Sequence, residues 1–243
     1  DDPRFIVPRV VEEYSSDHVI ASTYESGHPV GSEPVQSLSL ERRSALGKGA
    51  LELFLSELFI WNEIQTDPNF GNYRIRLAEE TGDRDCIVLL DFGAVQRYSD
   101  EFLGPVRDMI RASYEQDLDA VIEGGIKLNF MQADWPRPVL ERFGGVCMRV
   151  LEPLSGEAME KPDYAVNERG EYRWKQSDLP NRVAREATRS AINRYFRMPP
   201  KEFVFLNRKL VGVYTFIAVL AAEFDGEPVL RHYLYGESGS TSG

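Results

Sequence analysis

Apolar residues recur at helical spacing through most of the chain. From Ser39, whose hydroxyl can cap a helix, to about Trp61 they return every four positions, so one face of a long helix is predicted to be buried. Ser99 and Asp117 can cap two further helices, and Pro136 fits the first turn of another. The helices predicted after the first one cover residues 99–116, 117–130, 136–151, 181–197 and 200–224.

Strand-like patterns are confined to the first hundred residues. Two β-type runs, 5–11 and 18–24, flank a polar turn and predict a hairpin. A second hairpin is predicted from 73–77, which alternates in polarity, and 86–90, which is continuously apolar, with turn residues over 78–85 between them. The expected fold class is therefore α+β, mostly helical, with a small β-hairpin and short N-terminal strands.

The composition is that of a folded, acidic protein. Hydrophobic residues make up 42% and charged residues 28% of the 243 positions, which excludes a disordered or collagen-like chain. The net charge of −11 argues against nucleic acid as a partner. Cys86 and Cys147 have no second Cys or His at metal-ligand spacing and are interpreted as buried thiols. The longest uncharged apolar run, 210–222, is shorter than the ~20 residues that cross a bilayer and is interpreted as a buried helix.

Three polar residues can supply what phosphoryl transfer needs, a carboxylate that acts on the proton of the nucleophile and oxygen ligands for Mg²⁺. Asp67 and Asn72 are five positions apart, as are the Asp and Asn of the kinase loop H-R-D-x-x-x-x-N, and Asp91 opens a D-F-G. If the second hairpin pairs antiparallel, Asn72 lies beside Asp91, where one Mg²⁺ can contact both. Asp67 then lies close to the metal-bound phosphate, where it can act on a substrate hydroxyl or water.

Each of these segments also has an ordinary structural interpretation. Asp67-Pro68-Asn69 can form a simple Asx-type turn, and Asp91-Phe92-Gly93 can be a strand that ends in a turn. The joint spacing across a hairpin favours the catalytic interpretation.

The same segments resemble a known family. Residues 64–72 (IQTDPNFGN) and 88–98 (VLLDFGAVQRY) are similar to the UbiB/ADCK (AarF-domain) atypical kinases, in which a QTDPxxxN-type loop replaces the H-R-D loop. Residues 7–11 and 24–27 resemble the late N-lobe strands and hinge of that family. Residues 199–202 with 208–210 resemble its C-terminal helix.

The resemblance implies a protein-kinase-like C-lobe that binds ATP and Mg²⁺. It implies Asp67 as the catalytic carboxylate and Asn72 and Asp91 as metal ligands. It also implies Mg-ATP-dependent phosphoryl transfer or ATP hydrolysis in support of ubiquinone or isoprenoid-lipid metabolism. The hinge residues expected near the adenine are Thr23, Tyr24, Glu25 and Ser26.

The sequence departs from the family pattern in its N-terminal part. The KxGQ element, the nucleotide-covering loop, the phosphate-contacting Lys and its Glu partner are not found, and Gly47-Lys48-Gly49 is not a P-loop. We therefore expect residues 1–30 to be a remnant of N-lobe strands and hinge and residues 31–236 to be the C-lobe, with a loop insertion over 152–180 and a disordered tail over 237–243. The N-lobe is expected as a missing partner in cis, without which ATP binds weakly and is not turned over.

Other interpretations remain open at this point. A pseudokinase-like regulatory module would bind nucleotide or lipid without turnover, and aminoglycoside- or choline-kinase-like enzymes share the Asp-x4-Asn loop, although Gln65 disfavours them. The basic residues between 181 and 209 are expected to pair with the protein's own carboxylates, with association with anionic lipid or a membrane surface as the second interpretation. The expected location is cytoplasmic or peripheral to a membrane. The sequence does not identify the phosphoryl acceptor.

Overall fold

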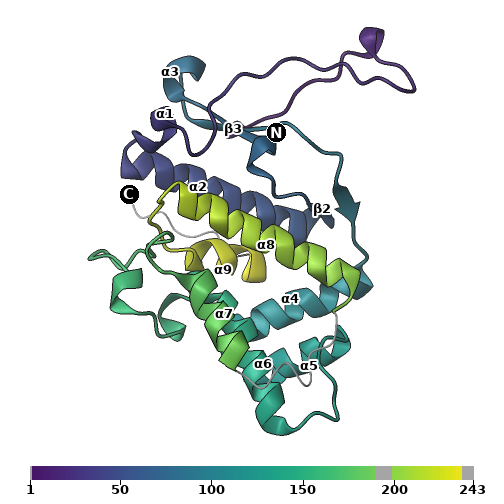
Figure 1. The fold of residues 1–243 in the computed structure, drawn as a ribbon, viewed down its shortest axis with the longest axis vertical. Coiled ribbons are helices and arrows are strands. Elements are labelled where there is room, and N and C mark those ends of the chain that lie inside the picture. Colours follow the sequence, from purple (N-terminus) through teal and green to yellow (C-terminus); the bar gives the residue numbers. More distant parts are fainter. Residues whose placement is uncertain (1, 190–198, 237–243) are drawn as a thin grey trace.

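The computed structural model describes residues 2–189 and 199–236. Two long helices, α2 (Leu40–Ser56) and α8 (Lys201–Val219), run side by side through the centre of the molecule (Figure 1). The small strands lie above them in this view. The helices between residues 100 and 189, here called the helical base, lie below. The mostly helical α+β class predicted from the sequence is observed.

The remaining elements have the following bounds. The strands are β1 (Phe5–Ile6), β2 (Glu63–Gln65), β3 (Tyr73–Arg76), β4 (Cys86–Leu89) and β5 (Val95–Arg97). The helices are α1 (Glu33–Gln36), α3 (Ala78–Thr81), α4 (Asp100–Tyr114), α5 (Leu118–Lys127), α6 (Arg137–Val150), α7 (Leu179–Arg189) and α9 (Glu227–Tyr235). A five-residue π-helix (Glu57–Trp61) continues α2.

Side-chain caps start three of the predicted helices. Ser39 accepts the backbone N–H of Arg42 at the start of α2, and Ser99 does the same for α4. Asp117 accepts the N–H of Ala120 at 3.0 Å and starts α5. These oxygens bind backbone donors that a helix cannot satisfy itself, which is why the predicted starts are confirmed within a residue.

The central hairpin forms as predicted. Strands β3 and β4 are antiparallel, with Tyr73 opposite Leu89 and Arg76 opposite Cys86. Strand β1 adds to the other edge of β4 in parallel, so the sheet order is β1-β4-β3. A separate two-stranded sheet joins β2 to β5 and was not predicted. The two sheets bring residues 63–73 and 86–97 together above α2.

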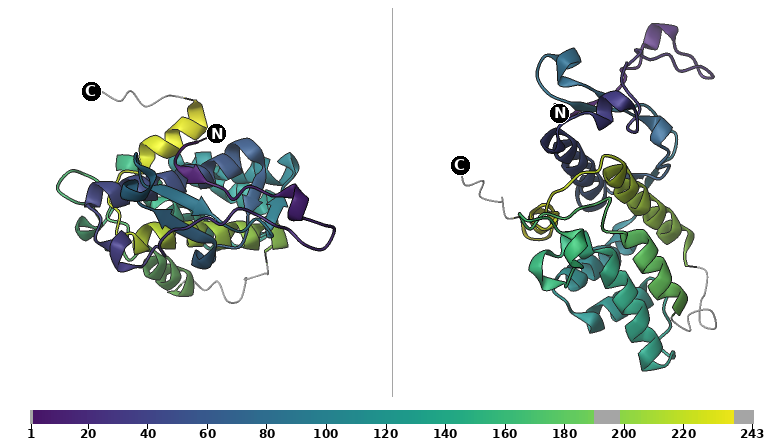
Figure 2. Two further views of the ribbon diagram at one scale, coloured as in Figure 1. Left: turned by 90° about the horizontal axis from the view of Figure 1, so that it is seen from above. Right: turned by 60° about the vertical axis from the view of Figure 1, so that its left-hand side comes forward.

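The N-terminal hairpin is weaker than the pattern predicted. Residues 10–22 form an arm that leaves the body of the molecule (Figures 1 and 2), and its two sides form isolated bridges, such as Val10 with Ser22, rather than a continuous ladder. Its side chains have little to pack against, and Ile20 is 81% exposed. Backbone alternation alone does not make a stable two-stranded sheet.

The C-terminal half also differs in detail from the prediction. The last predicted helix ends earlier, at Val219, because Ala221 adopts a left-handed conformation (φ 48°), and α9 was not predicted. The end of the helix predicted over 181–197 and the predicted tail at 237–243 lie outside the described residues. Across the described ranges no helix is both long and apolar enough to cross a membrane.

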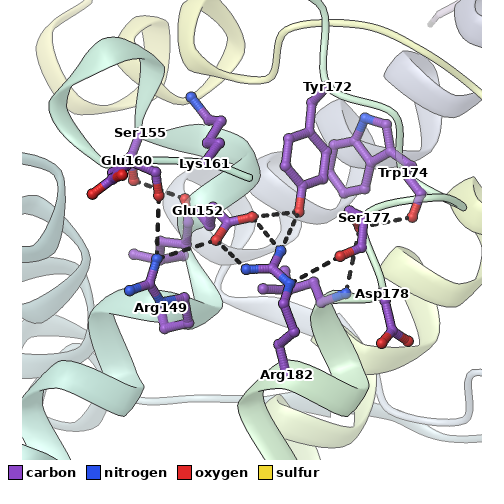
Figure 3. A network of polar contacts seen from close by, with 12 residues as sticks. Arg149, Glu152, Ser155, Glu160, Lys161, Tyr172, Trp174, Ser177, Asp178 and Arg182 are labelled. Atoms are coloured by element: carbon purple, nitrogen blue, oxygen red, sulfur yellow. Dashed lines mark hydrogen bonds and ion pairs between the residues drawn. The ribbon is translucent and has the colours of Figure 1, made fainter. Parts of the chain in front are cut away.

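The segment 152–180, predicted as an aperiodic loop, contains short helical turns at Glu152–Leu154, Gly156–Ala158 and Asp163–Ala165 and surrounds a buried carboxylate. Glu152 is completely buried and accepts hydrogen bonds from Arg182 of α7 and from the Tyr172 hydroxyl (Figure 3). Arg149 of α6 approaches it from the other side, at 3.3 Å. This network connects the segment to two helices of the base.

Candidate active site

The loop that carries Asp67 is fixed by backbone pairing to the D-F-G segment. It follows β2, whose partner β5 comes directly after that segment. Thr66 donates both its backbone N–H (3.0 Å) and its hydroxyl (2.8 Å) to the carbonyl of Ala94. Because Thr66 is buried and bound twice, the next residue, Asp67, is held beside the D-F-G segment.

The Gln65 side chain joins the two loops directly. Its amide nitrogen donates to the Asp91 carbonyl at 2.8 Å, and its amide oxygen accepts the backbone N–H of Asp67. Gln65 is 7% exposed, so this link is shielded from water. Gln65 belongs to the motif predicted from the sequence, but this linking role was not predicted. A side chain that binds backbone groups of two different loops leaves no recognisable residue spacing in the sequence.

Asn72 and Asp91 line the same cleft, which has a volume of about 900 Å³. The backbone N–H of Leu90 donates to the Asn72 carbonyl at 2.9 Å, so the end of β4 lies against the start of β3. Asp91 is exposed, and one of its carboxylate oxygens accepts the N–H of Gly93. The antiparallel pairing therefore places both residues at one wall, as the hairpin predicts.

Asp67 lies next to Asn72 and is partly open to solvent. The Asn72 amide nitrogen donates to one Asp67 carboxylate oxygen at 3.1 Å. Arg208 of α8 donates to the other at 3.0 Å. The Asp67 side chain is 34% exposed, so it is not sealed in the core.

Helix α8 supports this loop from below. A Cβ atom at Gly212 would lie only 2.1 Å from the Cβ of Pro68, so glycine allows the helix backbone to touch the residue after Asp67. Residues 208–210 belong to the family resemblance, but the sequence pattern did not indicate Arg208 as a site residue. The local excess of basic residues was the available signal.

The basic residues near the C-terminal helices are engaged within the protein. Among those whose side chains are described, Arg182 binds Glu152, Arg185 binds Asp178, Arg208 binds Asp67, and Lys209 binds Glu57. The expectation of internal pairing holds for these four.

The predicted hinge residues lie near the far end of β3. Arg76 binds the Glu25 carboxylate at 2.8 Å and the Ser26 carbonyl at 2.9 Å, and its hydrogen bond lowers the pKa of Glu25. The Thr23 hydroxyl donates to Glu25, while Tyr24 is 91% exposed. In the described part of the chain the cleft is lined by residues of the preceding segment, such as Phe5 and Val7, rather than by residues 23–26. Contact of the hinge with adenine stays a prediction.

The donors at the cleft fit a metal that arrives with phosphate. Within the described ranges, no three His, Cys, Asp or Glu residues lie close enough together to hold a metal alone. Asn72 and Asp91 offer one amide and one carboxylate. Mg²⁺ binds proteins through few oxygen ligands and completes its shell with water and substrate phosphates, so this pair suits Mg²⁺ bound to a nucleotide.

Comparison with known proteins adds a family match. A model of the ABC1 atypical kinase-like domain matches residues 1–124, just over half of the chain. This region includes Asp67, Asn72 and Asp91.

Several curated proteins are similar over nearly the whole chain. The probable serine/threonine-protein kinase abkA of Dictyostelium discoideum is 26% identical over 227 residues, which is 93% of this chain and 38% of that protein. The mitochondrial atypical kinase coq-8 of Caenorhabditis elegans is 28% identical over 237 residues (96% and 29%). The mitochondrial atypical kinase COQ8 of Saccharomyces cerevisiae is 25% identical over 222 residues (91% and 41%). The chain thus spans between 29% and 41% of the length of these relatives.

A solved structure shares the fold. The complex of Rv3197 with erythromycin from Mycobacterium tuberculosis matches with a TM-score of 0.67 and 22% identity, covering 97% of this chain and 53% of that one. The kinase-like C-lobe predicted from the sequence is confirmed by this likeness.

Proposed function

Because the chain belongs to the ABC1 (UbiB/ADCK) family of atypical kinases, we propose that it binds Mg-ATP at the cleft beside β3 and β4 and supports phosphoryl transfer or ATP hydrolysis. The observation that carries the proposal is the joint placement of Asp67, Asn72 and Asp91. Two of them line one cleft, and the third is hydrogen-bonded to Asn72.

The roles proposed for these residues follow from their chemistry. Asn72 and Asp91 would hold Mg²⁺, which neutralises charge on the phosphates when bound. Because the side-chain nitrogen of Asn72 donates to Asp67, the side-chain oxygen Oδ1 of Asn72 is the atom left to face the metal. Asp67 would orient the attacking hydroxyl or water and accept its proton.

We propose that this chain supplies the C-lobe of a two-lobed site. Residues 1–30 would be N-lobe strands and hinge, with residues 23–26 near the adenine, and residues 31–236 would be the C-lobe. The greater length of the relatives is consistent with a further lobe that covers the phosphates. Similarity to the COQ8 proteins supports a role in ubiquinone or isoprenoid-lipid metabolism at a membrane surface.

One observation favours a second function, a nucleotide-binding regulatory module without turnover. Both carboxylate oxygens of Asp67 accept hydrogen bonds, one from Arg208 and one from Asn72. A carboxylate held between these two donors must exchange one of the hydrogen bonds before it can contact a substrate hydroxyl or water.

Two substitutions in the full-length protein test the proposal. Asp91→Asn should abolish Mg-dependent ATP binding, because a neutral amide cannot offset the charge of the metal. Asp67→Asn should leave the dissociation constant for Mg-ATP within about threefold and lower turnover by at least about a hundredfold, because it removes the proton acceptor. Calorimetric titration and phosphate release measure the two effects. Equal loss of ATP binding in both variants would refute the separate roles. If the wild-type protein binds Mg-ATP but does not turn it over, the regulatory module is favoured.

A further inference from the structure

A buried ion pair lies beneath the catalytic loop. Glu57 is 6% exposed and Lys209 is 2% exposed. The Lys209 Nζ atom lies 3.1 Å from Oε1 and 2.8 Å from Oε2 of Glu57. These residues are 152 positions apart in the chain, and the pair joins the end of the α2 segment to α8.

Glu57 occupies this place through an unusual piece of backbone. It is the first residue of the π-helix that ends at Trp61, and Asn62 then turns the chain in a left-handed conformation (φ 58°). π-Helical turns are rare and are frequently found at functional sites. Strand β2 begins directly after this turn, so the turn sets how the chain enters the catalytic loop.

The pair is connected to both sides of the cleft. Glu57 lies close enough to the backbone N–H of Gln65 for that group to favour the charged carboxylate, and the Gln65 side chain binds the Asp67 N–H and the Asp91 carbonyl. On the other side, the Lys209 ammonium lies near the phenol of Tyr73, the residue after Asn72. Glu57 itself lines the cleft.

We propose that Glu57 and Lys209 are positioning residues that hold the Asp67 and Asp91 loops in register with α8. Lys209 follows Arg208, which binds Asp67, so the pair fixes the rotation of α8 that presents Arg208 to the loop. The activity part of this inference rests on the proposed function. The structural part does not.

Single and double substitutions distinguish a pair that positions the loops from a pair that only stabilises the fold. Removing one partner of a buried ion pair leaves an uncompensated charge and is strongly destabilising, whereas replacing both by apolar residues of similar volume is often neutral or stabilising. A pair that served only the stability of the fold could therefore be exchanged for two methionines without harm. A pair that positions the loops could not, because methionine offers no negative charge to the Gln65 N–H.

The test compares four forms of the full-length protein: wild type, Lys209→Met, Lys209→Arg, and the double variant Glu57→Met/Lys209→Met. We expect Lys209→Met to be less stable and the double variant to unfold at a urea concentration close to that of wild type. We nevertheless expect both to lose at least about tenfold in kcat, whereas Lys209→Arg, which keeps the charge, should stay within about threefold of wild type.

A readout that needs no activity completes the test. Hydrogen exchange in the double variant should be at least about tenfold faster at residues 62–73 and 90–95 and unchanged in α5, which lies further from the pair than α4, whose Arg107 binds the carbonyl of Leu58. Equivalent substitutions at the other buried pair, Glu152→Met/Arg182→Met, are the control and should leave exchange in those two loops unchanged. If the double variant has the same hydrogen-exchange rates in these two loops and the same kcat as the wild type, the inference is overturned. A wild type without turnover would count against the proposed function alone, and the exchange result would still decide this inference.

Discussion

Two buried glutamates, one beneath the catalytic loop and one in the helical base, differ in how completely they are satisfied. Glu152 accepts two charged hydrogen bonds from Arg182 and one from the Tyr172 hydroxyl (2.8 Å), and Arg149 adds a weaker contact (Figure 3). Glu57 has a single lysine, and within the described residues its Oε2 atom has no well-aligned hydrogen-bond donor.

The difference changes the direction of the pKa shift. Burial raises the pKa of the Glu57 carboxyl, and Lys209 and the Gln65 N–H offset only part of that effect. Burial also acts on Glu152, but the hydrogen bonds from Arg182 and Tyr172 outweigh it and lower the pKa of that carboxyl. A bidentate guanidinium matches both carboxylate oxygens, whereas an ammonium is a point charge.

The two regions differ in whether their buried carboxylate is fully satisfied. The base contains a closed network, which fits a structural connection between α6, the 152–180 segment and α7. The site contains an under-satisfied carboxylate at the wall of the cleft, next to the loops that must bind phosphate and metal. Groups whose pKa is perturbed by burial cluster at functional sites, and Glu57 is such a group.

The largest expected effect is in the closed network. Arg182→Met should lower the free energy of unfolding by about 3–5 kcal/mol, because it leaves the fully buried Glu152 without its main partner. Arg185→Met on the same helix is the matched control. Arg185 is 61% exposed and binds Asp178 at the surface, so its loss should cost no more than about 1 kcal/mol. Urea unfolding measures both, and equal effects would show that the network contributes nothing special.

A second prediction concerns the contact between α8 and the catalytic loop. Gly212→Ala should destabilise the protein by about 1–3 kcal/mol, because the added Cβ overlaps Pro68. It should also lower kcat, since Pro68 cannot move without Asp67. Gly145→Ala in α6 is the control, because a Cβ there meets nothing within 4 Å and alanine favours a helix over glycine by about 0.5–1 kcal/mol. If Gly212→Ala keeps wild-type kcat, α8 does not position the loop.

Local patterns predicted the parts of the fold that depend on local physics. The caps Ser39, Ser99 and Asp117 and the antiparallel β3–β4 hairpin follow from residue type and alternation, and the structure confirms them. The π-helix after α2 and the extra helix α9 did not follow. The first depends on where Glu57 meets Lys209, and the second on burial of Leu230 and Leu234 against the rest of the molecule.

The sequence predicted the part of the candidate site that depends on the spacing of residues within the motifs. The motif spacing named Asp67, Asn72 and Asp91, and the hairpin placed the last two together. Arg208, Lys209 and Gly212 act on the site from about 140 residues further along the chain, for example from Arg208 to Asp67. The local excess of basic residues marks the region of Arg208, but no local pattern shows which residues it contacts, because only the packing of α8 against the loop creates the contact.

The smallest effect expected is a difference in pH dependence between the two glutamates. A carboxyl whose pKa is raised on folding contributes its full stability below its ordinary value of 4.5, and that contribution is lost as the pH rises through the folded-state pKa. A carboxyl whose pKa is lowered contributes fully above 4.5 and loses that contribution as the pH falls. The stability lost in Glu57→Gln, relative to wild type, should therefore shrink as the pH rises above 4.5. The loss in Glu152→Gln should shrink as the pH falls below 4.5, with neither slope above about 1.4 kcal/mol per pH unit. Urea unfolding of the three proteins across the acid and neutral range measures the slopes, and slopes of the same sign would mean that the two carboxylates are satisfied alike.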